Sequence, residues 1–231
     1  MNAYDLLAQD LNKYTVGDVT KLVAWLRQWL SPESMGYSMG YGHDSDPVLV
    51  LKRVKPHLTH KAVDALALAC GDLLEEFLAQ PRQPRDYAYN LLRITDIVAR
   101  KSLVPTLVEQ LDRFALWNPI AVQVALAIIL DSGIKQSEQF WKQVLVVDPA
   151  SFSGFAMNGL LDIDIQEAAK VVPVMAHNNA TANLTVLMLD LFYDKADEAQ
   201  RQEVIAAVQA QIAKCVEAAQ SPLQTWLDSK N

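Results

Sequence analysis

The stretch that decides the fold is NPIAVQVALAIILDSG, residues 118–133. Asn118 can cap a helix that starts at Pro119, where a proline is tolerated because the first N–H groups of a helix have no partner inside it. Gly133 is well placed to end that helix. The residues between are apolar nearly all round the helix, which is typical of a helix packed between neighbours. The sequence therefore predicts an all-α protein built around buried helices.

The same helix-start signal recurs at a regular distance along the chain. Asp148-Pro149 and Ser221-Pro222 also place a capping residue directly before a proline. Outgoing helices are predicted to begin near residues 84, 119, 149 and 180, and return helices near 103, 137, 165 and 198. A spacing of about 30 to 35 residues with two helices per unit indicates an α-solenoid.

Two internal matches support a repeat. LVPTL at 103–107 recurs in character as VVPVM at 171–175, and the helix end at 125–131 recurs at 156–162. Together with Ile94-Thr95-Asp96, these segments resemble the HEAT-like repeat family over roughly residues 84–195. The resemblance implies a right-handed α-solenoid of antiparallel helix pairs, whose extended surfaces commonly hold another macromolecule.

We expect residues 1–231 to form a single domain with three parts. Residues 1–80 form an irregular helical cap containing a long loop at 31–46, residues 84–219 form the repeats, and residues 221–231 form a C-terminal segment. In the cap, Thr15 and Asp18 can form a capping box, and Thr59 can cap the next long helix. Trp226 in the last segment either docks on the preceding helix or offers an anchor to a partner.

Composition excludes several classes of protein. Of the 231 residues, 51% are hydrophobic, which is ample for a core, and the longest apolar tract is about half of the roughly 20 residues needed to cross a bilayer. The start lacks a secretory pattern, so we expect a cytoplasmic protein with no membrane association. The net charge of −7 argues against broad nucleic-acid binding and is compatible with a basic protein partner.

Signatures of catalysis are missing from the sequence. There is no Gly-rich phosphate loop or Gly-x-Ser-x-Gly elbow, and neither cysteine has a partner at metal-ligand spacing. His57 and His60 could converge with residues 43–46 on a metal ion, but the four basic residues near them oppose a cation. We expect no catalytic residues, no metal and no cofactor.

Two groups of residues could bind a partner. The first lies in the Gly/Tyr-rich segment SMGYSMGYGHDSDP, residues 34–47, which is either a recognition loop or a connector. The second is a set of acidic residues at predicted turns, which either cap helices or form a ridge for a basic partner. The candidate residues are Tyr37, Tyr41, His43, Asp44, Asp46, Asp131, Asp162, Asp164, Asp190 and Asp194.

These features lead to two hypotheses of function. The first is a non-catalytic protein-binding module, with a bacterial immunity-type inhibitor that masks a basic toxin as its specific form. The alternative is a nucleic-acid-binding or processing protein, for which glycosylases of the HEAT-like family give a precedent by analogy. It would use the basic segment 52–101, where nine basic residues face six acidic ones. Its candidate contacts are Lys52, Arg53, Lys55, Arg82 and Arg85.

Overall fold

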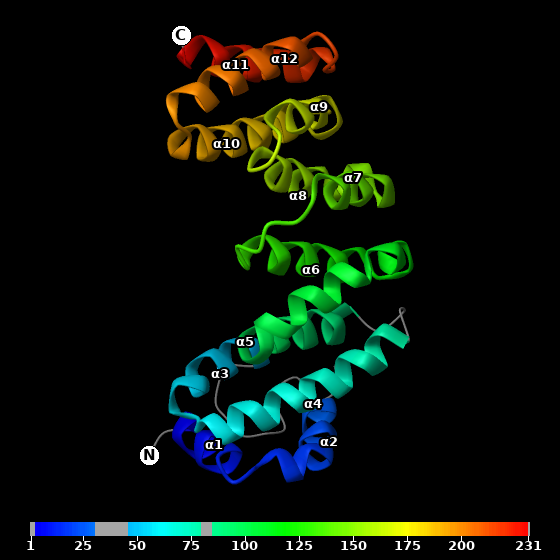
Figure 1. Cartoon of the computed structure of the whole chain (residues 1–231), viewed down its shortest axis with the longest axis vertical. Helices are drawn as coiled ribbons and strands as arrows, with labels where there is room; N and C mark the ends of the chain where they lie inside the picture. The colour runs from blue at the N-terminus through cyan, green and yellow to red at the C-terminus, as the bar shows by residue number, and fades with distance from the viewer. Residues whose placement is uncertain (1–2, 31–45, 80–84, 231) are drawn as a thin grey trace. The chain divides into compact units, whose positions relative to one another are not determined.

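The computed structural model describes residues 3–30, 46–79 and 85–230 of the chain. Every regular element in these ranges is a helix, and none is a strand, which confirms the all-α prediction. No helix in the described ranges combines the length and the apolar character that crossing a membrane requires. The chain forms two compact units, residues 1–132 and 133–231 (Figure 1).

The first unit holds the helices that lead up to Ser132 (Figure 1). Helix α4 packs against α2 and α5, while α5 also contacts α3 and α6, so α4 and α5 form the centre of this unit. Their inward side chains, such as Leu73 and Phe77, are almost fully buried. The elements are α1 (Ala3–Leu11), η1 (Val16–Asp18), α2 (Val19–Leu30), α3 (Pro47–Val54), η3 (Lys55–His57), α4 (His60–Ala79), α5 (Arg85–Glu109), η4 (Leu111–Leu116) and α6 (Pro119–Asp131).

The second unit is a series of six helices in which contacts run between neighbours and next neighbours. Helix α8 packs against α7 and α9, α9 packs against α11, and α12 packs against α10 and α11. Helix α10 touches α8 only slightly, so one of its sides is left open. The helices are α7 (Glu138–Val147), α8 (Pro149–Leu161), α9 (Ile165–Met175), α10 (Asn179–Lys195), α11 (Glu198–Ile212) and α12 (Glu217–Lys230).

Several predicted helix starts are confirmed by the capping hydrogen bonds that the structure contains. Asn118 accepts a hydrogen bond from the Ile120 amide at 3.0 Å, and Asp148 accepts one from the Ala150 amide at 3.1 Å. Thr15 and Asp18 form the expected capping box. Gly133 has a φ of 69°, a left-handed conformation in which a side chain is strained, and it follows the end of α6.

Two predicted boundaries are wrong. The break expected near residue 103 lies at Ala99, whose φ of −140° and ψ of 31° interrupt α5, so Pro105 lies within the helix that follows. The start predicted at Pro222 also comes too late, because α12 begins at Glu217. Its buried residues begin at Ala219 and continue through Leu223 to Trp226, so packing of this stripe extends the helix upstream of the proline.

Candidate binding surfaces

A row of exposed leucines runs along α10. Leu184, Leu187 and Leu191 are 51%, 54% and 55% exposed. Their spacing of three and four residues places them on one face of the helix. Ala182 and Leu189 on the other side of α10 are fully buried. The helix is therefore apolar on two sides, although only one of them packs into the core.

A hollow of about 320 Å³ adjoins this row. It opens between α10 and the end of α8, the two helices that touch only slightly. Leu191 of the row lines this hollow, whose lining mixes apolar and polar side chains. The lining residues are Asn158, Asp162, Met188, Leu191, Phe192, Lys195, Ala196 and Gln200.

The acidic residues predicted at turns in this unit divide into two kinds. Asp164 caps α9 by accepting the Glu167 amide at 3.0 Å. Asp190 accepts the Trp226 indole N–H at 2.8 Å and also lies 2.8 Å from the Lys230 ammonium. These two carboxylates stabilise the unit itself, whereas Asp162 and Asp194 are exposed and have no side-chain partner among the described residues.

The Asp190 contact also decides between the two interpretations of Trp226. The Trp226 side chain is 3% exposed and packs edge-on against Tyr193. The tryptophan therefore docks on α10 as part of the core. It is not available as an anchor for a partner.

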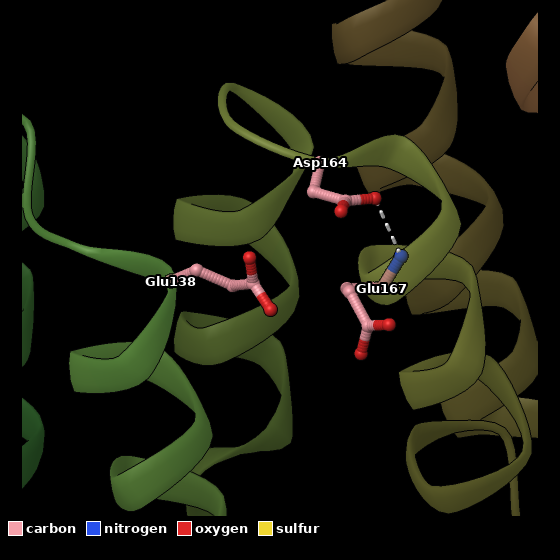
Figure 2. Close-up of side chains that lie close together, drawn as sticks. All are labelled: Glu138, Asp164 and Glu167. Atoms are coloured by element: carbon pink, nitrogen blue, oxygen red, sulfur yellow. Dashed lines mark hydrogen bonds between the residues drawn. The ribbon is translucent and has the colours of Figure 1, made fainter.

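Three carboxylates gather where α7 and α9 meet (Figure 2). Oxygens of Glu138, Asp164 and Glu167 lie within 4.8 Å of one another. Two lysines pair with the two glutamates: the Lys142 ammonium is 2.5 Å from Glu138 and 2.9 Å from Glu167, and Lys170 pairs with Glu167. The hydrogen bonds from Lys170 and Lys142 hold the pKa of Glu167 below its ordinary value. The cluster is therefore an ion-pair network that joins α7 to α9.

Sequence reasoning did not identify this network. Glu138 and Glu167 are 29 positions apart in the sequence. Considered alone, each is an ordinary acidic residue in the first turn of its helix. Nothing in the local sequence shows that side chains of α7 and α9, which both pack on α8, come close enough for Lys142 to pair with Glu167. The only hint is the return-helix spacing, which places both helices on equivalent positions of a repeat.

The basic residues proposed for nucleic acid are not all directed to one place. Lys52 and Lys55 line a cleft beside α5. Arg53 instead donates to the Tyr4 hydroxyl at 2.5 Å and lies over its ring. Arg82 and the side chain of Arg85 are outside the described residues.

The residues considered for metal binding lie at helix ends. Asp46 caps α3 by accepting the Val48 amide at 2.8 Å, and His57 and His60 are exposed. The Asn12 side chain bridges the segments on either side of Leu58. Its Nδ2 donates to the His57 carbonyl at 3.0 Å, and its Oδ1 accepts the Thr59 backbone N–H at 2.7 Å. The remaining loop candidates, Tyr37, Tyr41, His43 and Asp44, lie outside the described residues.

Asp131 belongs to the first unit and ends α6. Its side chain is exposed at the rim of the cleft that Lys52 and Lys55 line.

Comparisons of the chain with protein-family models, curated proteins and solved structures find no match.

Proposed function

We propose that this chain is a non-catalytic binding protein whose second unit holds a basic, amphipathic segment of another protein. The segment would lie along α10, with apolar side chains on Leu184, Leu187 and Leu191 and one side chain in the adjoining hollow. The observation that carries the proposal is the row of three leucines, each more than half exposed.

An exposed apolar row of this kind costs free energy in water. Burying a leucine side chain contributes roughly 1.5–3 kcal/mol relative to leaving it exposed. Single exposed leucines are ordinary on protein surfaces, but a contiguous apolar patch beside a hollow is typical of an interaction site. Apolar residues spaced three and four apart suit a partner helix that presents its own apolar stripe.

The charges around the row favour a basic partner. Residues 133–231 contain seven Lys and Arg residues against twelve Asp and Glu residues, a net of −5. Asp162 at the hollow and Asp194 in the last turn of α10 are both exposed and unpaired among the described residues. Such acidic groups at a rim speed association with a basic segment and select against acidic ones. A basic toxin, masked by an immunity-type inhibitor, is one partner with this chemistry.

The packing of the second unit is consistent with the solenoid architecture that we propose for it. Return helix α9 packs against the next return helix α11, and α10 packs against α12. This next-neighbour packing is how helical pairs stack in HEAT-like repeats, which commonly serve as binding surfaces.

The proposal is tested by substitution of the leucine row. Proteins captured from the source organism's lysate are identified, purified and titrated by calorimetry against the native chain and the variants. We expect Leu187→Gln combined with Leu191→Gln to weaken binding at least about tenfold, since two buried apolar contacts are lost. Val146→Gln is the matched control, because Val146 is 83% exposed on α7 of the same unit and lies outside the row and the hollow.

A second pair of variants tests the charge. Asp162→Lys with Asp194→Lys should slow association, and the effect should shrink as salt is raised. A purified partner that binds the leucine variant as tightly as the native chain would rule out the α10 face. A partner with an acidic binding segment would contradict the proposed chemistry.

A further inference from the structure

A cleft of about 510 Å³ lies in the first unit, where α3 and η3 meet α5 near the end of α6. It contains four of the chain's basic side chains and two carboxylates. The lining residues are Lys52, Lys55, Pro56, Arg93, Asp96, Ile97, Arg100 and Asp131. A positive lining is notable because the whole chain carries a net charge of −7.

Helical spacing explains why these residues converge. Arg93 and Asp96 are three residues apart on one face of α5, and Arg100, just past the Ala99 interruption, is held to Asp96 by two hydrogen bonds. Lys52 and Lys55 are three residues apart at the end of α3 and the start of η3. Because α3 packs against α5, the two basic faces meet at one cleft.

Two of the cations are held in fixed positions. The Arg100 guanidinium donates from Nε to Asp96 Oδ1 at 2.6 Å and from Nη2 to Oδ2 at 2.8 Å, and its Nη1 donates to the Asp131 carbonyl at 3.3 Å. The Asp96 side chain is only 8% exposed, so this pair is anchored in α5. The Lys55 ammonium donates to the Ile97 carbonyl, which fixes its position without neutralising its charge.

The other two cations have no carboxylate partner among the described residues. Lys52 makes no ion pair there, and Arg93 makes neither a hydrogen bond nor an ion pair there, with its guanidinium carbon 6.0 Å from the centre of the Tyr89 ring. The lining therefore carries four positive charges against two negative ones, and Arg100 already balances Asp96. Like charges gathered in this way repel one another, and a bound anion would relieve the repulsion.

We propose that this cleft binds a small anion carrying one or two phosphate groups. Planar Arg forks and Lys ammonium groups are the side chains that recognise phosphate oxygens in proteins. Arg100 and Lys55 are preorganised at the cleft, and Lys52 and Arg93 supply the charge that is not balanced internally. The site lies in the other unit from α10, so this inference is independent of the proposed function.

The geometry favours a small anion over a nucleic acid. Affinity for a duplex grows with the number of phosphates that Lys and Arg neutralise, and this cleft offers only four cations. Arg53, the next basic residue along α3, pairs with Tyr4 instead of extending the positive surface. Asp131 at the rim would repel a polymer that continues past the cleft.

The test uses the full chain with inorganic phosphate, pyrophosphate and a sugar phosphate as probes, at constant ionic strength. Binding is measured by calorimetry and by the shift in unfolding temperature. We expect at least one probe to bind, and Lys52→Gln combined with Arg93→Gln to weaken it at least about tenfold, because two charge-assisted contacts are lost. The three probes distinguish free phosphate, a diphosphate group and a phosphate ester.

Lys61→Gln combined with Lys101→Gln is the control. It removes the same charge from exposed residues of this unit that do not line the cleft, so binding should be retained. The proposal is overturned if none of the probes binds, if the control weakens binding as much as the cleft variant does, or if only a DNA or RNA oligonucleotide binds. Unfolding temperatures without ligand show whether both variants remain folded.

Discussion

The indole of Trp141 lies directly against the backbone of Gly159. A Cβ atom built on Gly159 would lie 2.0 Å from Trp141 Cε2 and 2.4 Å from Nε1, far inside van der Waals contact. Helix α7 therefore packs on α8 by placing its largest side chain where α8 has none. Trp141 is 2% exposed, so this contact is in the core of the second unit.

We expect Gly159→Ala to lower the free energy of unfolding by at least about 2 kcal/mol, because Trp141 must leave its position or α7 must move. The matched control is Gly154→Ala in the same helix, where the nearest atom to an added Cβ is Met175 Cε at 3.6 Å. That contact is ordinary, and alanine favours a helix over glycine by up to about 1 kcal/mol. Urea unfolding, followed by tryptophan fluorescence, measures the free energy of unfolding of both variants. Equal stabilities for the two variants would contradict this account of the α7–α8 contact.

The hydrogen bond between Trp226 and Asp190 should contribute to the docking of α12 on α10. Trp226→Phe removes the donor and leaves Asp190 with Lys230 alone, which we expect to cost about 1 kcal/mol. Asp194→Asn is the control, because Asp194 is exposed on the same helix and has no partner in the described part of the chain, so its substitution should change stability by less than about 0.5 kcal/mol. Thermal unfolding compares the two. A loss for Trp226→Phe no larger than that for the control would contradict the structural role assigned to Asp190.

Cys70 should make the protein less stable in alkaline solution. Burial raises the pKa of the Cys70 thiol from its ordinary 9.0 to about 12 and outweighs the opposing effect of a hydrogen bond with Thr95. Between these two values the unfolded chain loses the thiol proton and the folded chain keeps it, so stability falls as pH rises through this window. At pH 10 the loss is about 1 kcal/mol relative to neutral pH.

The measurement is the difference in unfolding free energy between the native chain and Cys70→Ala at pH 7 and at pH 10. Because other groups titrate equally in both proteins, the change in this difference isolates the Cys70 thiol. We expect the advantage of the native chain to shrink at pH 10. A difference that stays constant with pH, or rapid labelling of Cys70 by a thiol reagent in the folded protein, would contradict a fully buried thiol.

The sequence alone was sufficient to predict the all-α class and most helix starts. Asn118, Ser137 and Asp148 act on backbone amides two or three residues away, so their effect is encoded within a few positions of the chain. Gly133 likewise ends α6 through its own backbone conformation. Where local signals competed with packing, as at Pro222, the buried stripe of α12 determined the boundary.

Only the tertiary structure decided which side chains are free to act. Asp190 and Asp194 lie one turn apart with the same chemistry, yet one is tied to Trp226, which is 36 positions away, and the other is exposed. Lys52 and Arg53 are adjacent, yet one lines the cleft and the other pairs with Tyr4. The sequence does not distinguish the exposed leucine row on α10 from buried core residues. Apolar residues at helical spacing look the same whether or not another segment covers them. Exposure and pairing depend on contacts between segments far apart in the chain, and local sequence does not specify those contacts.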